Sequence, residues 1–223
     1  MITPVNSDVG KHPAQSLLPK PILPKRVGLL GGSFNPAHSG HFLISQLALK
    51  ILALDQVWWL VSPQNPIKLA RDMAPFSARF TNATEFAEIE PRILVSDSEL
   101  HLGTQYTADT LPKIKARFGG IRFVWLMGAD NLVQIHRWRQ WTQIFKSMPV
   151  AVFDRPTYSF FAKSGIAARR FATSRVSQAR AAGLADQPAP AWVFLSAATD
   201  TASATAIRKE KMDLRSGAIN HRA

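Results

Sequence analysis

Hydrophobic and polar positions along the chain follow two alternating patterns. Short apolar runs rich in β-branched and aromatic residues predict buried strands at residues 26–31, 56–62, 92–97, 121–128, 149–154 and 191–196. Longer segments with apolar residues at helical spacing predict helices at residues 40–52, 76–90, 107–118 and 137–146. This alternation is typical of a doubly wound α/β fold, with a mostly parallel Rossmann-like sheet and helices on both faces.

Residues 1–24 follow neither pattern. They contain five prolines, at positions 4, 13, 19, 21 and 24, and few large apolar residues. A segment of this composition buries too little surface to become ordered. We therefore expect a flexible Pro-rich tail at residues 1–24 and a single domain at residues 25–223.

Composition and charge narrow the possible chemistry. The 223 residues include no cysteine, which excludes disulfides, cysteine nucleophiles and thiolate zinc sites. No apolar run approaches the length of a membrane span and residues 1–24 lack a signal-peptide pattern, so we expect a cytoplasmic protein without a membrane partner. A net charge of +12 is compatible with nucleic acid, a small polyanionic substrate or a solvated basic surface. Because the basic residues are dispersed and do not alternate with aromatic ones, we expect no physiological nucleic acid.

The segment GGSFNPAHSGH, at Gly31–His41, connects the first predicted strand to the first predicted helix. In doubly wound sheets, ligands bind beyond the carboxyl ends of strands, which is where this segment lies. It has neither a P-loop sequence nor dinucleotide-type glycine spacing, yet the helix start still offers backbone N–H groups to an anion. His38 and His41 can both donate to phosphate oxygens. The pair favours a phosphate-binding loop over the alternative, a capped helix with two solvent-facing histidines.

The same segment resembles the HxGH signature of the nucleotidyltransferase superfamily. The superfamily's second signature, a Ser/Thr-rich helix start ending in arginine, resembles SATAIR at Ser203–Arg208. Between them, VSPQNPIK, TQYTADTL, LMGADNLVQIHRW and VFDRP are similar to nicotinate-nucleotide adenylyltransferases, in the correct order. The resemblance covers about residues 26–208. The chain departs from it at Asn35, where the family usually carries aspartate; asparagine keeps the turn-forming hydrogen bond and lacks the charge.

This resemblance implies transfer of the adenylyl group of ATP to nicotinic acid mononucleotide, giving nicotinic acid adenine dinucleotide and pyrophosphate in NAD biosynthesis. Mg²⁺ would be carried with ATP. The nucleophile is a phosphate oxygen already ionised at neutral pH, so catalysis amounts to placing two polyanions and neutralising the leaving pyrophosphate. The alternatives are an adenylyltransferase for nicotinamide mononucleotide or pantetheine phosphate, and a non-catalytic nucleotide- or RNA-binding protein. A monomer and a homo-oligomer are both compatible with the sequence.

The resemblance also assigns roles to individual residues. The catalytic residues are His38, His41 and Arg208. The ATP-binding residues are Gly31, Gly32, Ser33, Phe34, Gly40, Lys68, Asp130, Ser203 and Thr205. Asp130 has an alternative role as the N-cap of the short helix that follows it. For the acceptor, Trp138 stacks on the pyridine ring, the N–H groups of Tyr106 and Thr107 bind its carboxylate, and Arg155 holds its 5′-phosphate.

Overall fold

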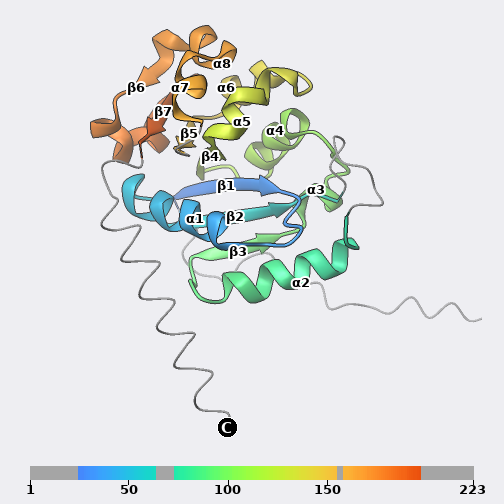
Figure 1. Ribbon diagram of the computed structural model, residues 1–223. Helices are drawn as coiled ribbons and strands as arrows, with labels where there is room; N and C mark the ends of the chain where they lie inside the picture. The colour runs from blue at the N-terminus through green and yellow to red at the C-terminus, as the bar shows by residue number, and fades with distance from the viewer. Residues whose placement is uncertain (1–24, 64–72, 155–157, 197–223) are drawn as a thin grey trace, which may run out of the picture.

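A parallel sheet of seven strands forms the centre of the computed structural model, which describes residues 25–63, 73–154 and 158–196 (Figure 1). In order across the sheet the strands are β3 (Ile93–Ser96), β2 (Gln56–Val61), β1 (Arg26–Gly32), β4 (Arg122–Gly128), β5 (Val150–Phe153), β7 (Trp192–Leu195) and β6 (Arg175–Val176). All the pairings between these strands are parallel. The strand order reverses at the β1–β4 pair, so the carboxyl ends of these two strands mark the expected ligand side.

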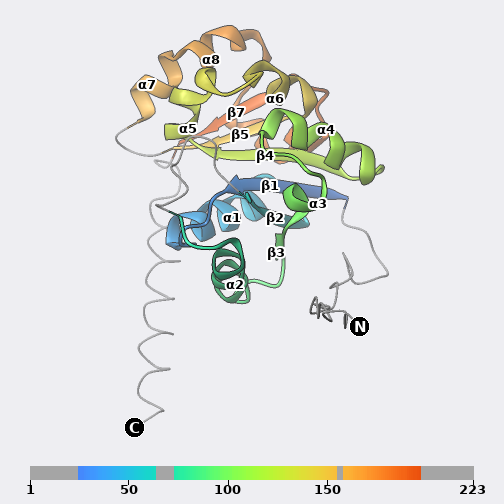
Figure 2. The same ribbon diagram turned by 90° about the vertical axis from the view of Figure 1, so that its right-hand side faces the viewer.

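Helices cover both faces of the sheet, and each face has its own hydrophobic core (Figure 2). One core contains residues of α1 (Ser39–Ile51), α2 (Phe76–Ala87) and the 3₁₀ helix η4 (Gln178–Asp186). The other contains residues of α4 (Thr107–Arg117), α5 (Ala129–Gln134), α6 (Trp141–Ser147), α7 (Ser159–Ser164) and α8 (Ile166–Arg170). The remaining short elements are α3 (Ser98–His101), η2 (Ile135–Arg137) and η3 (Ala172–Ser174). Within the described residues, no helix has the length and apolar character needed to cross a membrane.

The predicted doubly wound α/β fold is confirmed, and the structure differs from the prediction in local features, among them the short helices α3, α7 and α8, which were not predicted. The predicted helix at residues 137–146 is two elements, because η2 ends at Arg137 and α6 begins at Trp141. Gln140 lies between them with φ +48°, a left-handed conformation that a continuous helix does not allow. Strand β6 was not predicted, since its two residues are too short to show any periodicity.

Close packing between β1 and β4 explains one of the glycines in the loop signature. A Cβ atom added to Gly31 would lie closer to the Cη2 atom of Trp125 on β4 than real contacts allow. Trp125 is 2% exposed and lies in the core on the α4 side of the sheet. Gly31 is therefore required for strand packing, whatever it also does for a ligand.

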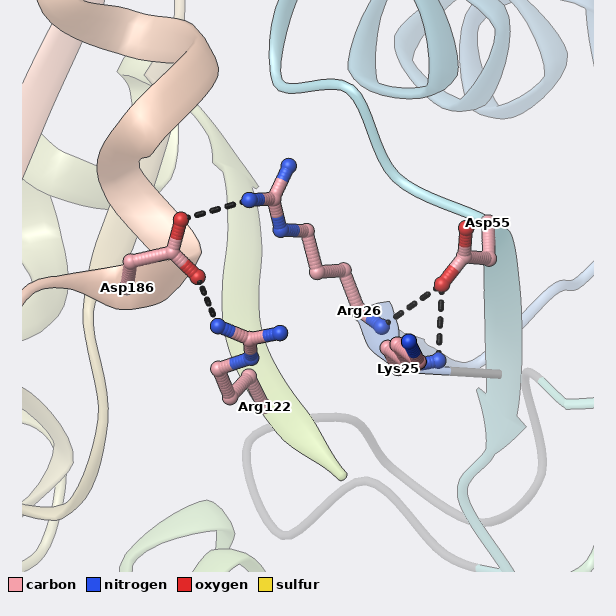
Figure 3. A network of polar contacts seen from close by, with 5 residues as sticks. All are labelled: Lys25, Arg26, Asp55, Arg122 and Asp186. Atoms are coloured by element: carbon pink, nitrogen blue, oxygen red, sulfur yellow. Dashed lines mark hydrogen bonds and ion pairs between the residues drawn. The ribbon is translucent and has the colours of Figure 1, made fainter. Parts of the chain in front are cut away.

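A polar network holds together the amino ends of the central strands (Figure 3). The Asp186 carboxylate accepts hydrogen bonds from the guanidinium groups of Arg26, at 2.6 Å, and Arg122. The Asp55 carboxylate accepts the backbone N–H groups of Lys25 and Arg26 at 2.7 and 2.8 Å. The network links β1, β4, η4 and the residue that precedes β2. The predicted tail at residues 1–24 lies outside the described residues, so the predicted division into tail and domain stays a prediction.

Candidate active site

A cavity of about 360 Å³ lies at the carboxyl ends of β1 and β2 and is also lined by Trp125 of β4. This volume is within the range of small-molecule sites. Its lining includes Gly31, Gly32 and Ser33 of the segment Gly31–His41, together with Tyr106, Thr107 and Trp138. Sequence reasoning did not identify the other lining residues, which are Ser62, Glu99, Gln105, Trp125, Arg137, Arg139 and Ile144. The fold thus brings part of the predicted ATP-binding loop and three of the four predicted acceptor-binding residues to one cavity.

Hydrogen bonds at the start of α1 connect His38 and His41. His38 is the N-cap residue, and its Nδ1 atom accepts the Gly40 N–H at 3.1 Å. The Nδ1 atom of His41 accepts the His38 N–H at 3.2 Å, and the two ring centroids are 3.9 Å apart. A neutral imidazole that accepts at Nδ1 carries its proton on Nε2. The histidines do cap the helix, as the alternative interpretation held, and this capping sets Nε2 as the donor of each ring.

The His41 ring packs against a cluster of buried aromatic residues. The ring of Phe34 lies 4.6 Å from His41 and 5.0 Å from Trp59, between centroids. Phe34 is 1% exposed and has φ +43°, a strained conformation for a large residue that dense packing maintains. The indole of Trp59 donates to Ser45 Oγ at 2.7 Å, and this hydroxyl donates to the His41 carbonyl at 2.9 Å. Because the Phe34 side chain is buried, any contact between Phe34 and ATP would come from its backbone.

Arg79 of α2 clamps the loops that form the cavity wall. Its guanidinium donates to the carbonyls of Ser33 at 2.6 Å, Ser62 at 2.9 Å, Pro63 at 2.9 Å and Ala74 at 3.0 Å. The residue is 2% exposed, and burial lowers the pKa of the guanidinium from its ordinary value. Sequence reasoning missed this residue. The available signal was an arginine four and eight positions before Ala83 and Ala87, on the buried face of a helix.

Two asparagines add further ties between the segment Gly31–His41 and α2. The Asn82 side chain accepts the Ala37 N–H at 3.0 Å, and the Asn35 side chain accepts the Ala74 N–H at 3.2 Å. The amide at Asn35, where the family usually has aspartate, therefore joins this segment to the chain just before α2. This contact needs only a side-chain oxygen that accepts a hydrogen bond, and both asparagine and aspartate have one.

The start of α4 forms the opposite wall of the cavity. Tyr106 is the N-cap residue and makes no side-chain cap, and the N–H groups of Tyr106 and Thr107 have no acceptor in the described part of the chain. The Arg139 guanidinium lies 4.8 Å from the Tyr106 ring centroid and 3.5 Å from Asp109. Trp138 is half-buried against the core on this side of the sheet. This wall combines a helix N-terminus, arginines and an aromatic face, which suits an aromatic anion.

Glu99 of α3 also lines the cavity and is 5% exposed. Burial raises the pKa of its carboxyl to about 7, although a hydrogen bond from Thr110 acts in the opposite direction. That bond is 3.4 Å long, and Thr110 Oγ1 is also 2.8 Å from Thr104 Oγ1 and 3.1 Å from the Tyr106 carbonyl. In sequence, the segment SDSELHLG gives no sign that its glutamate is buried, because short polar segments usually face solvent.

The remaining predicted residues lie elsewhere. Asp130 is in the first turn of α5, whose N-cap is Gly128, so its alternative role as N-cap is wrong. His38, Gly40, His41 and Asp130 do not line the 360 Å³ cavity. Lys68, Arg155, Ser203, Thr205 and Arg208 lie outside the described residues. In the part of the chain that the structure describes, no three His, Asp or Glu side chains come together as metal ligands.

Comparisons with known proteins agree with the resemblance seen in the sequence. The model of the cytidylyltransferase-like family matches residues 29–210. A curated "probable nicotinate-nucleotide adenylyltransferase" from a Caulobacter species is 50% identical over 183 residues, which are 82% of this chain and 96% of the relative. One of the same name from Parvibaculum lavamentivorans is 48% identical over 184 residues, covering 82% and 91%.

A solved structure supports the fold. The nicotinic acid mononucleotide adenylyltransferase of Plasmodium falciparum, complexed with NaAD, has a TM-score of 0.58 and 16% identity, and the match covers 77% of this chain and 75% of that one. This likeness concerns the arrangement of strands and helices. The curated relatives are far more similar in sequence, and the match covers nearly the whole length of each of them. The chain therefore belongs to the nicotinate-nucleotide adenylyltransferase family of nucleotidyltransferases.

Proposed function

We propose that this protein transfers the adenylyl group of ATP to nicotinic acid mononucleotide, giving nicotinic acid adenine dinucleotide and pyrophosphate in NAD biosynthesis. The observation that carries the proposal is 50% identity over 183 residues with a relative of that name, a match that covers 96% of that relative. The cavity supports it, because residues assigned to ATP and to the acceptor line the same space.

The reaction needs positioning more than proton transfer. An oxygen of the acceptor's 5′-phosphate attacks the α-phosphorus of ATP, and the bond from that phosphorus to the pyrophosphate oxygen breaks. The attacking oxygen is already ionised at neutral pH, so no general base is required. Catalysis then depends on holding the two polyanions in line and on donors aimed at the charge that develops.

His38 and His41 are the proposed donors to the ATP phosphates, with His41 acting at the α-phosphate. The hydrogen bonds support this role, since both rings accept a backbone N–H at Nδ1, and a neutral ring that does so has its proton on Nε2. The His41 ring packs against Phe34, and its carbonyl accepts a hydrogen bond from Ser45, so both contacts limit the motion of His41. A donor whose orientation is fixed before the reaction lowers the barrier without reorganising during it.

Further ATP contacts come from Gly31, Gly32, Ser33 and Gly40, and from residues outside the described part of the chain. For the latter, the sequence signatures alone support Lys68, Ser203, Thr205 and Arg208. Asp130, at the carboxyl end of β4, is the remaining proposed nucleotide contact. Mg²⁺ enters as part of the substrate MgATP, with phosphate and water oxygens as its ligands.

The proposed acceptor site is the wall formed by Tyr106, Thr107 and Trp138. Trp138 stacks on the pyridine ring, and the N–H groups of Tyr106 and Thr107 bind its carboxylate at the α4 N-terminus. Arg155, outside the described residues, binds the 5′-phosphate. A nicotinamide ring would turn an NH₂ group toward donors, and each donor left unpaired costs on the order of 1–3 kcal/mol. We therefore propose a preference for the acid of tens- to thousands-fold.

A pyrophosphate-release assay with ATP and a panel of acceptors tests this function. Nicotinic acid mononucleotide is expected to be the best substrate, ahead of nicotinamide mononucleotide and pantetheine phosphate. An equal or better rate with nicotinamide mononucleotide would contradict the acceptor assignment. Absence of pyrophosphate release with every acceptor, with salt-dependent RNA binding, would instead support a non-catalytic role.

The stacking role of Trp138 has its own test in the same assay. Trp138→Ala should raise the KM of both mononucleotides by similar factors and leave the acid preference intact, because both rings present the same face. Trp141→Ala is the matched control. Trp141 is also half-buried and packs on Phe145 and Phe171, and it does not line the cavity. Its loss should affect stability without changing either KM.

A further inference from the structure

Glu99 places a carboxyl group in the wall of the proposed acceptor cavity. The residue is 5% exposed and lines this cavity together with Tyr106, Thr107 and Trp138. The Thr104 N–H donates to the Glu99 carbonyl at 3.0 Å, so the turn after α3 folds back over the residue. The carboxyl has one side-chain hydrogen bond in the described part of the chain, from the Thr110 hydroxyl at 3.4 Å. Its position is fixed by α3 and by the start of α4.

No cation in the described residues forms an ion pair with Glu99. The titratable and charged groups around it, on its own element, on α4 and around the cavity, are Asp97, His101, Tyr106, Asp109, Lys113, Arg137 and Arg139. Five of these groups have other partners, since Asp97 contacts His101, Arg139 pairs with Asp109, and Lys113 donates to the Leu102 carbonyl. Strand β2, which packs against α3, carries no charged residue. Burial without a counter-charge raises the pKa of Glu99 to about 7.

We infer that Glu99 is a specificity residue of the acceptor cavity, which admits a pyridine carboxylate when Glu99 is protonated and opposes it when Glu99 is ionised. This inference rests on the proposed function and deepens it. Two carboxylates in one buried cavity disfavour each other's ionised form. A neutral Glu99 removes that repulsion and adds an O–H donor beside the N–H groups at the start of α4.

A neutral pyridine amide meets the opposite situation. It carries no charge to repel, and its NH₂ group can donate to an ionised Glu99. The preference for the acid over the amide should therefore decrease as the pH rises through the titration of Glu99. The change belongs to binding, so it should appear in KM and leave kcat unchanged.

Steady-state kinetics with both mononucleotides between pH 6 and pH 9 test the inference. The 5′-phosphate of both ligands titrates near pH 6, so this titration cancels in the ratio of their kcat/KM values. The ratio then reports only the difference between the two ring substituents. In the unmodified protein this ratio should fall at least tenfold between pH 6.5 and pH 9, through the KM of the acid. In Glu99→Gln, which keeps a neutral amide in place of the carboxyl, the ratio should stay constant within about twofold.

Asp97→Asn is the matched control. Asp97 immediately precedes α3, two residues from Glu99; its Oδ1 atom lies 3.1 Å from His101 Nδ1, and it does not line the cavity. Its pH profile should match that of the unmodified protein. A profile flattened equally by Asp97→Asn and Glu99→Gln would overturn the assignment to Glu99.

Calorimetry gives a readout that needs no turnover. At pH 8, binding of nicotinic acid mononucleotide in two buffers of different ionisation enthalpy should show uptake of close to one proton, beyond any uptake measured with nicotinamide mononucleotide. Glu99→Gln should abolish the difference; if that variant does not fold, the two ligands on the unmodified protein still decide the matter. Equal uptake with both, or a pH-independent ratio in the unmodified protein, would overturn this inference alone. Turnover of neither mononucleotide would overturn the proposed function, and this inference with it.

Discussion

At the scale of single residues, the hydrogen bond that one nitrogen of a histidine ring makes determines whether the other nitrogen can donate. The Nδ1 atoms of His38 and His41 are acceptors of backbone N–H groups, so each neutral ring presents a proton at Nε2. A doubly protonated ring would lose the acceptor, and with it the cap. The helix start and the donor function therefore depend on the same neutral tautomer.

His41→Ala should lower kcat at least a hundredfold with little change in the KM of ATP. The reason is that a donor to developing charge stabilises the transition state more than the bound substrate. His38→Asn, which keeps a good N-cap acceptor, should be milder. His101→Ala, at an exposed histidine paired with Asp97, is the control and should leave kcat unchanged. A His41→Ala variant with normal kcat and a raised KM would contradict the proposed role.

The buried Glu99 carboxyl should make folding stability depend on pH. Its pKa is raised to about 7 in the folded protein, against 4.5 ordinarily, so between these values the folded state keeps a proton that the unfolded chain has released. The free energy of unfolding should therefore fall as pH rises from about 4.5 to about 7 and level off above. At about 1.4 kcal/mol per pH unit, this loss amounts to roughly 3 kcal/mol.

Denaturant unfolding of Glu99→Gln at pH 5 and pH 8 measures this loss. The free energy of unfolding of the variant minus that of the unmodified protein should be larger at pH 8 than at pH 5. The increase should be up to roughly 3 kcal/mol. Glu88→Gln, at an exposed glutamate beyond α2, should keep the pH dependence of the unmodified protein. An equal pH dependence in Glu99→Gln would mean that Glu99 is ionised at neutral pH in the folded state.

At the scale of elements, α2 acts as a brace for two loops at the carboxyl ends of the strands. Arg79 binds the carbonyls of Ser33 after β1 and of Ser62 and Pro63 after β2. Asn82, one turn further along the same helix, holds the Ala37 N–H. Carbonyls in irregular loops have no strand or helix to pair with, so a buried guanidinium with five donors is an efficient partner for several of them.

Arg79→Lys should lower the free energy of unfolding by about 2–4 kcal/mol and raise the KM of ATP. A lysine ammonium keeps the charge, yet it has three donors at one point and leaves buried carbonyls without a partner. Thermal or denaturant unfolding gives the stability, and pyrophosphate release gives the KM. For comparison, Arg92→Lys alters an exposed arginine paired with Glu90 and should cost under about 1 kcal/mol. Equal losses in the two variants would contradict the brace.

The elements that sequence patterns predicted are those whose pattern reports burial directly. β4 is buried over all but its first residue and reads as a continuous apolar run, so its prediction was reliable. The signature loop was recognisable because its spacing is local in sequence. Arg79 was not, because its role arises from contacts with distant segments at Ser33 and Ser62. Glu99 was not, because it lies in a short polar segment that gives no sign of burial. The break at Gln140 depends on one backbone angle, which apolar periodicity does not encode.

At the scale of the whole molecule, the two ends of the parallel sheet have different tasks. The amino ends carry the network of Asp55 and Asp186, which joins Arg26, Arg122 and the Lys25 backbone. The carboxyl ends carry the cavity. Parallel strands make this separation possible, because all of them present the same end to the same side.

Removing residues 1–24 should leave the molecule intact. The deletion ends before Lys25 and Arg26, whose N–H groups bind Asp55, so the first contacts of β1 are retained. We expect a melting temperature within about 2 °C of the full chain and unchanged kcat/KM, measured by thermal unfolding and pyrophosphate release. A fall of more than about 5 °C, equivalent to more than 1 kcal/mol, would mean that the tail packs on the domain.

The position of Lys25 has a practical consequence. β1 has seven residues, so at about 3.3 Å per residue its amino end lies roughly 20 Å from Gly32 and the cavity. A fluorescent reporter, a solid support or a fused enzyme, joined just ahead of Lys25 in place of the tail, would approach the molecule from the end opposite to its substrates. The protein could thus be immobilised by its amino terminus with the entrance for nucleotides still open.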